Sequence, residues 1–323
     1  MRHPNNVPAH RFAIGNITAA VLAGVLFAGC LSAQLFKANT RLVVLHATVT
    51  DHKGRFVSNL TKKQFQVYEN GKLQKIKLFL HEDAPVSLGL IIDDSGSMES
   101  KRSRVEAASL AMVRQSNRDD EVFVVNFNDD AYLDVPFTNS IPRMRQGLAR
   151  IDARGGTAMR DAISMSLDYM REKAKQNKRV LMVITDGNDN ASTITLERLV
   201  EKANQYDTLV YAIGLFGDEE KHEAHKARRA LNELTRATGG LAFYPRSVSQ
   251  VKVLAVKIAH DIRNQYTIAY SPDIQKLDGS YRQIKVVVDA KGHPHVRTRA
   301  GYYATPEILK NNRQTAENRT RQP

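Results

Sequence analysis

The chain has 323 residues, of which 42% are hydrophobic and 25% charged, the balance of a globular protein with room for one large domain or two. Its formal net charge of +13 would suit nucleic acid, anionic lipid or an acidic partner, but the lysines and arginines are spread along the chain, which favours an ordinary basic surface. The sequence carries no zinc-finger or RRM signature, so we expect no nucleic-acid binding. Cys30 is the single cysteine, which excludes an intramolecular disulfide and a cysteine-rich metal site.

Residues 1–33 have the layout of a secretory signal. Basic residues precede an apolar stretch at 12–28, and small residues follow near Cys30 and Ala33. The sequence FAGC also resembles the lipobox of bacterial lipoproteins, in which the cysteine is lipidated and becomes the new N-terminus. There are two alternatives: an ordinary signal peptidase cleaves after Ala33, or the segment is retained as a membrane anchor. We therefore expect an exported protein of the periplasm, cell envelope or exterior, with Cys30 as a candidate site of membrane attachment.

Residues 40–84 are predicted to form the first part of a small β domain. The run RLVVLHATV is rich in β-branched residues, which favour strands. Further along, Asn70 and Gly71 separate two strand-like runs, and this dipeptide is typical of a tight β-hairpin turn.

Residues 86–264 are predicted to form an α/β domain with a doubly wound, mostly parallel sheet. Continuous apolar runs such as VSLGLIID and RVLMVITD indicate strands buried on both faces. The run AYLDVPF follows another strand so closely that we expect it to pair antiparallel. The strands alternate with predicted helices at 101–117, 158–176, 195–206, 220–238 and 247–264.

Strand-like sequence returns in residues 265–304. Because 40–84 and 265–304 are each too short to bury a core of their own, we expect them to pair into one β-sandwich-like domain. The α/β domain would then be inserted between its two parts, which is feasible because the ends of a compact domain often lie close together. Residues 305–323 are polar and basic, and we expect a disordered tail.

Oxygen-bearing side chains gather where the predicted strands of the α/β domain end. Asp93, Ser95 and Ser97 follow one buried strand, Asp186 follows another, and Thr157 directly precedes a helix. Ligands of doubly wound sheets bind at the carboxyl ends of the strands, so these loops bring carboxylates and hydroxyls to one edge. Hard oxygen donors without His or Cys suit Mg²⁺, Mn²⁺ or Ca²⁺ rather than zinc.

This arrangement resembles the metal-ion-dependent adhesion site of von Willebrand factor type A domains, because three separated motifs match it in order and spacing over about 86–264. The flanking sequences, such as VTDHKGRFVSNLTKKQF and YTIAYSP, also resemble the von Willebrand factor A-related proteins of acidobacteria over about 40–304. The likeness implies a bacterial binding and adhesion protein with a divalent cation, Mg²⁺ first.

The resemblance also implies a role for each motif residue. Asp93, Ser95 and Ser97 would form the first metal loop, with the serine hydroxyls as direct ligands. Thr157 would bind directly or through water, and Asp186 mostly through water. We expect the partner to be a protein whose exposed acidic residue completes the shell of the cation.

An enzyme is disfavoured by the same residues. A haloacid-dehalogenase-type phosphatase has a second Asp two places after its nucleophile, where this chain has Ser95 after Asp93. The sequence DDSGS does not match the G-x-S-x-G of serine hydrolases. We therefore predict a non-enzymatic binding module. The alternative is a structural or assembly protein of the cell envelope whose metal site is vestigial or only stabilises the fold.

Overall fold

The computed structural model describes residues 42–81, 83–149, 154–216 and 221–306. The chain divides into two units, 1–40 and 41–323, and all described residues belong to the second. The predicted export signal with Cys30, and all but the first two residues of the predicted tail, lie outside the described residues. Within the described part, no helix is both long and apolar enough to span a lipid bilayer.

A six-stranded, mostly parallel sheet forms the centre of the α/β region. Its strand order is β10-β9-β8-β5-β6-β7, and only β7 runs antiparallel to its neighbour, as the sequence predicts. The fold-class prediction is confirmed. The strands are β5 (Val86–Asp93), β6 (Glu121–Phe127), β7 (Ala131–Thr138), β8 (Lys178–Thr185), β9 (Thr208–Gly214) and β10 (Ala242–Phe243).

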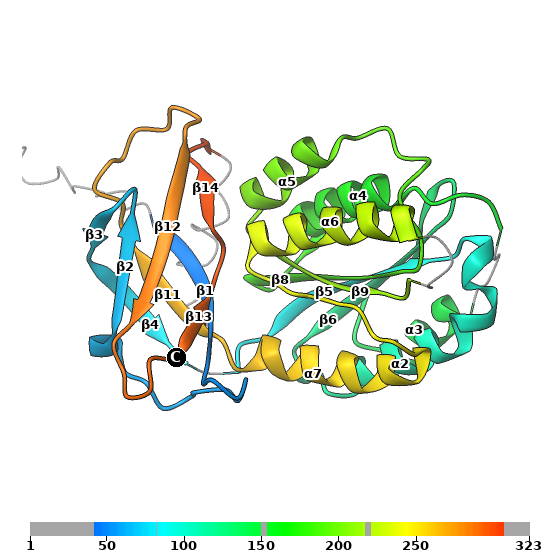
Figure 1. The fold of residues 1–323 in the computed structure, drawn as a ribbon, viewed down its shortest axis with the longest axis horizontal. Coiled ribbons are helices and arrows are strands. Elements are labelled where there is room, and N and C mark those ends of the chain that lie inside the picture. The colour runs from blue at the N-terminus through cyan, green and yellow to red at the C-terminus, as the bar shows by residue number, and fades with distance from the viewer. Residues whose placement is uncertain (1–41, 82, 150–153, 217–220, 307–323) are drawn as a thin grey trace, which may run out of the picture. The chain divides into compact units, whose positions relative to one another are not determined.

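Helices cover both faces of this sheet (Figure 1), with α4, α5 and α6 on one face and α2, α3 and α7 on the other. Alternate residues of β5 therefore enter different cores: Leu90 and Ile92 face α2 and α7, while Ile91 faces α4. The helices are α2 (Arg102–Val113), α3 (Ile141–Leu148), α4 (Met159–Lys173), α5 (Leu196–Gln205), α6 (Lys221–Thr238) and α7 (Val251–Arg263).

Two helices differ from the sequence prediction at their first turns. The helix expected from residue 101 is preceded by the 3-10 helix η2 (Gly96–Lys101), and the one expected from 247 begins with η3 (Val248–Gln250). Helix α3 was not predicted. The helices expected at 158–176, 195–206 and 220–238 are present within a few residues of those bounds.

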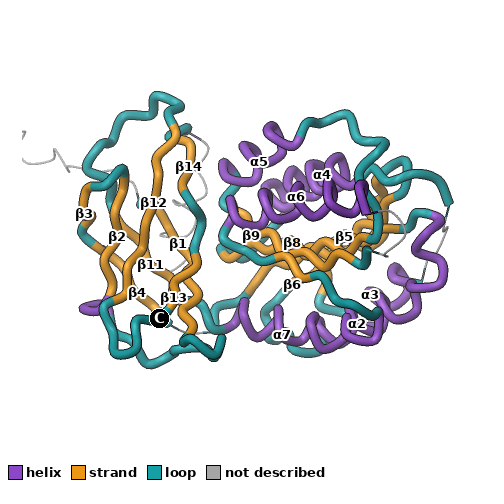
Figure 2. The backbone as a smooth tube through the Cα atoms, viewed as in Figure 1, coloured by secondary structure: helices purple, strands orange, loops and turns teal. Residues whose placement is uncertain are grey.

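Two four-stranded antiparallel sheets are built from both ends of the described chain, with the orders β13-β1-β11-β4 and β14-β12-β2-β3. Figure 2 shows them as strands joined mainly by loops. β1 pairs with β11 and β2 pairs with β12, so each sheet joins an early strand to a late one. The strands are β1 (Val43–Thr50), β2 (Phe65–Glu69), β3 (Lys72–Gln74), β4 (Ile76–Leu80), β11 (Tyr266–Tyr270), β12 (Tyr281–Val288), β13 (His295–Arg297) and β14 (Gly301–Tyr303), with the 3-10 helix η1 (Lys62–Gln64) before β2.

The predicted hairpin at Asn70 and Gly71 joins β2 to β3. Both residues have positive φ, 47° and 80°, which is the backbone of the two-residue turns that match the twist of paired strands. Beyond the turn, one strand-like run of sequence splits at Lys75, and β3 and β4 join different sheets. The two sheets share one apolar core that includes Leu45 and Val67.

Candidate metal centre

The two predicted acidic ligands come from neighbouring parallel strands. Asp93 is the last residue of β5, and Asp186 directly follows β8. The register pairs Ile92 with Ile184, so both strands end at the same edge of the sheet. The long apolar runs place these strands at the centre of the fold, and the polar residues begin where the strands leave the core.

Asp93 is fully buried, and both of its carboxylate oxygens accept hydrogen bonds. Its Oδ1 accepts a hydrogen bond from the backbone N–H of Ser95 at 2.9 Å, and its Oδ2 accepts one from the hydroxyl of Thr185 at 2.5 Å. Among the described residues, no Lys or Arg forms an ion pair with this carboxylate. Burial raises the pKa of the Asp93 carboxyl, against the effect of these hydrogen bonds, and the charge of Asp186 raises it further.

Hydrogen bonds link the two serines to the second acid. The hydroxyl oxygens of Ser95 and Ser97 lie 3.3 Å apart, and Ser97 Oγ donates to Asp186 Oδ1 at 2.7 Å. Ser95 is buried, whereas Ser97 is exposed, and the Asp186 carboxylate is 1% exposed. These three predicted ligands therefore form a connected group that reaches solvent at Ser97.

Thr157, on the loop before α4, is the fifth predicted ligand. Its N–H donates to the side-chain oxygen of Asn190 at 2.9 Å, and its carbonyl accepts the N–H of Asn190 at 3.1 Å. A Cβ placed on Gly187 would come within 3.2 Å of the Thr157 hydroxyl oxygen. The hydroxyl thus lies against the residue that follows Asp186. The structure brings all five predicted ligands to one edge of the sheet.

Arg102 holds the loop that follows β5 in place through buried polar contacts, a role that the sequence did not reveal. Its guanidinium is 3.3 Å from Asp94 Oδ1, and both side chains are less than a tenth exposed. It also donates to the carbonyl of Asp93 at 3.3 Å and to the side-chain oxygen of Asn126 at 3.4 Å. Asp94, the variable position of the motif, therefore serves the loop structure by pairing with Arg102.

Lys101 is the second residue that sequence reasoning missed. Its ammonium forms an ion pair with Asp186 Oδ2 and donates to the carbonyl of Ser97 at 3.3 Å. Asp186 lies 85 positions from Lys101, so the sequence carries no local signal for this ion pair.

The donor set fits a hard divalent cation. Two carboxylates and three hydroxyls lie at one edge of the sheet, and the buried Asp93 carries a raised pKa that a neighbouring cation would lower. The described residues contain no cluster of three or more His, Cys, Asp or Glu that could hold a metal. A site here would therefore depend on its hydroxyl groups, as the motif implies.

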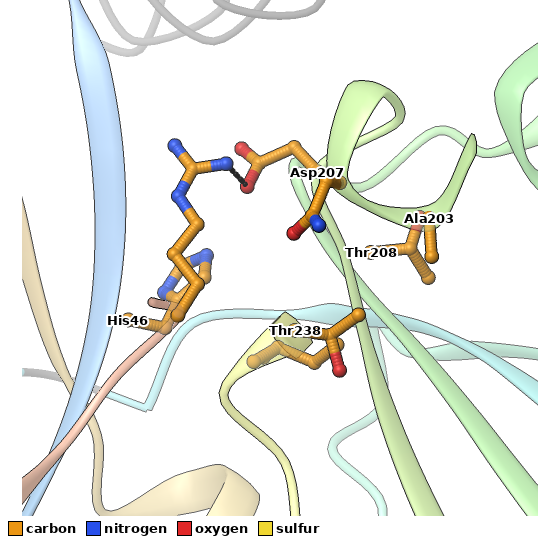
Figure 3. A pocket seen from close by; sticks show the side chains of 8 residues that line it. His46, Ala203, Asp207, Thr208 and Thr238 are labelled. Carbon is orange, nitrogen blue, oxygen red and sulfur yellow. Dashed lines mark hydrogen bonds and ion pairs between the residues drawn. The ribbon is translucent and has the colours of Figure 1, made fainter. Parts of the chain in front are cut away.

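A small pocket elsewhere in the chain is lined by His46, Ala203, Asp207, Thr208 and Thr238, among others (Figure 3). The Asp207 carboxylate is paired there with Arg299 at 2.8 Å. Thr208 begins β9, at the amino end of the sheet, because it is in register with Arg179 near the start of β8. The pocket thus lies at the opposite edge from the metal centre.

A comparison with protein families matches the first part of the α/β region. Residues 88–188 match the family model of the von Willebrand factor type A domain. The chain contains a von Willebrand factor type A domain. The matched span runs from β5 to the loop after β8, so it includes every ligand predicted for the metal centre.

Relatives of this von Willebrand factor type A domain protein match part of the chain. An uncharacterized protein of Borreliella burgdorferi is 26% identical over 240 residues, 67% of this chain and 65% of that protein. One of Synechocystis sp. is 25% identical over 151 residues, 44% of this chain and 35% of that protein. The chain thus spans less than two thirds of the length of each. Among solved structures, von Willebrand factor type A from Catenulispora acidiphila has 13% identity and a TM-score of 0.49, over 84% of this chain and 77% of that one.

Proposed function

We propose that this protein is an exported, non-enzymatic binding module that uses a divalent cation at its metal centre to bind a protein partner. The observation that carries the proposal is the group formed by Asp93, Ser95, Ser97 and Asp186, which is connected by hydrogen bonds and open to solvent at Ser97. Thr157 is the fifth ligand. Mg²⁺ is the preferred cation, with Mn²⁺ or Ca²⁺ as alternatives.

The partner is proposed to supply a carboxylate. Two protein carboxylates balance a divalent cation only formally, and the remaining donors are neutral hydroxyls, so the bound cation accepts a further hard oxygen. The net charge of +13 favours an acidic partner at long range, although physiological salt screens exposed charges beyond about 8 Å. An Asp or Glu of the partner supplies both the further oxygen ligand and the negative charge.

Export is proposed from the first 33 residues, with lipid on Cys30 as the first route. The mature chain then begins at Cys30, or near Gln34 if an ordinary signal peptidase cleaves it. Mass spectrometry of the protein purified from native membranes decides between the two. A chain that still begins with Met1 would contradict both routes.

The binding proposal is tested by affinity capture from cell-envelope extract. We expect a protein to be retained in Mg²⁺ or Mn²⁺, released by chelator and recaptured when the cation is restored. Asp93→Ala should retain none, whereas Asp119→Ala, an exposed acid near the amino end of β6, should behave as the wild type. The retained partner should lose binding when one exposed Asp or Glu is replaced. A partner retained equally in excess chelator would contradict the proposal.

A second candidate function is a structural protein whose centre only stabilises the fold. It is favoured by one observation, the ion pair of Lys101 with Asp186, because the chain itself supplies a positive charge to this acid. In that case Asp93→Ala would lower the free energy of unfolding while every captured partner stayed bound.

A further inference from the structure

The ammonium of Lys101 and the proposed cation share one ligand. Both oxygens of the Asp186 carboxylate are engaged: Oδ1 accepts the hydroxyl of Ser97 at 2.7 Å, and Oδ2 pairs with Lys101. The carboxylate is 1% exposed and the lysine side chain 25% exposed, so the pair lies mostly out of water. Coulomb interactions are strong in such surroundings.

The two basic residues at this loop, Arg102 and Lys101, differ in whether the charged end of the side chain can move into solvent. Arg102 is buried and bonded to Asp94, Asn126 and a carbonyl, so it is part of the loop framework. Lys101 is partly exposed at the end of η2, and the described contacts of its ammonium are with Asp186 and the Ser97 carbonyl alone. A flexible four-carbon stem allows this ammonium to move into solvent without changes in the backbone.

We propose that Lys101 is an internal counter-ion of Asp186 that a divalent cation must displace, so that this side chain sets the metal affinity of the centre. The inference rests on the proposed function, because it assumes that the cation binds at Asp186. An ammonium in contact with a ligand of a divalent cation is repelled by that cation, so binding includes the cost of breaking the ion pair. The centre is then built to bind metal more weakly than its donor set alone allows.

Calorimetric titration with Mg²⁺ and with Mn²⁺ tests the affinity. Lys101→Met keeps an unbranched side chain of similar size and removes its charge. It should bind each cation roughly fivefold more tightly or better, the value of a modest ion pair. Arg104→Met is the matched control, because Arg104 is exposed on the first turn of α2 and its loss removes the same charge. The control should bind cations as the wild type does.

Amine labelling tests the contact itself. The rate at which an amine-reactive ester modifies Lys101, measured by mass spectrometry of peptides, should rise when Mg²⁺ is added to the wild type. It should stay unchanged on addition of Mg²⁺ to Asp93→Ala, which lacks a metal ligand. It should be high without any metal in Asp186→Asn, which lacks the charged partner.

The outcomes separate this inference from the function on which it rests. If the wild type binds cations, but Lys101→Met binds them no more tightly and labelling does not respond, the inference is wrong and the function stands. If neither protein binds a cation, both are wrong. If only Lys101→Met binds, the inference is supported in its strongest form.

Discussion

Asp93 carries the main electrostatic cost at the metal centre. Burial raises the pKa of its carboxyl above the ordinary 3.8, hydrogen bonds from Ser95 and Thr185 act in the opposite direction, and the charge of Asp186 adds to the rise. A turn or helix cap gains little from burying such a carboxylate. A cation held by Asp93 and Asp186 would offset both the desolvation and the repulsion of these carboxylates, which is the physical reason to expect a metal here.

Lys178 is a second buried ionisable group, at the first position of β8. Its ammonium donates to the carbonyl of Ile262. Burial, assisted by the positive charge of Arg263, lowers the pKa of Lys178 from 10.5 to about 7. Three carboxylates oppose the shift only in part: Asp261, Asp83 and Asp120.

Stability should therefore rise with pH above neutrality. The folded protein releases the Lys178 proton near pH 7 and the unfolded chain releases it near 10.5, so the unfolded chain binds more protons between these values. The free energy of unfolding should increase there by up to about 1.4 kcal/mol per pH unit. Lys178→Met should remove this part of the rise, and Lys175→Met, an exposed neighbour, should keep it. Urea unfolding at about pH 7 and pH 9 measures the difference; an identical rise in all three proteins would rule out Lys178 as its source.

The predicted ligands are recognisable in sequence because a few residue types recur at fixed spacings after apolar runs. The basic residues that contact these ligands and their loop, Arg102 and Lys101, are not recognisable in the same way. Arg102 stands among charged residues of a predicted helix, where exposure is the usual outcome, and only the tertiary structure places it beneath the first loop. The contact between Lys101 and Asp186 joins residues 85 positions apart, so no local pattern contains it.

At the level of elements, β5 depends on a glycine in its middle. A Cβ on Gly89 would come within 2.4 Å of the Phe123 ring and 2.6 Å of the Leu181 side chain, which flank it on neighbouring strands. Gly89→Ala should therefore lower the free energy of unfolding by about 1–3 kcal/mol, the usual cost of overpacking a core. Gly96→Ala, where nothing lies within 4 Å of the added atom, should change it little. Chemical denaturation compares the two; equal small effects would show that β5 repacks freely.

Strands and helices with long, uniform patterns are predictable here, and short or divided ones are not. The central strands are continuous apolar runs, so their positions follow from sequence. Helix α3 has only eight residues and contains Gly147, which weakens its helical signal, while Pro142 in its first turn is compatible with a helix start. The break at Lys75 between β3 and β4 is a single residue. β3 pairs with the nearby β2, but the sheet that β4 joins depends on β11, more than a hundred residues away.

Across the whole described chain, Asp261 of α7 connects distant elements. Its carboxylate accepts hydrogen bonds from Thr48 of β1 and Tyr211 of β9, each at 2.9 Å, and pairs with Arg297 of β13. The acid is 3% exposed. Thr48 is 213 positions away in sequence, so neither the partner nor the burial could be predicted from local patterns.

Removal of Asp261 should be costly because it leaves the largely buried guanidinium of Arg297 without a carboxylate partner. Asp261→Ala should lower the free energy of unfolding by about 3–5 kcal/mol. Asp51→Ala, which breaks the surface pair with Arg55, should cost much less. Urea unfolding at neutral pH gives both values. Similar losses in the two variants would mean that the Asp261 pair does not hold the described chain together.

Divalent cation binding at the carboxyl edge of the central sheet is the claim on which the proposed function depends. Calorimetric titration of the purified protein with Mg²⁺ and Mn²⁺, beside the Asp93→Ala, Asp186→Ala double variant, tests it most directly. We predict one binding event in the wild type and none in the double variant, with circular dichroism showing that both are folded. Equal binding by the two proteins, or no binding by the wild type and by Lys101→Met alike, would contradict the account.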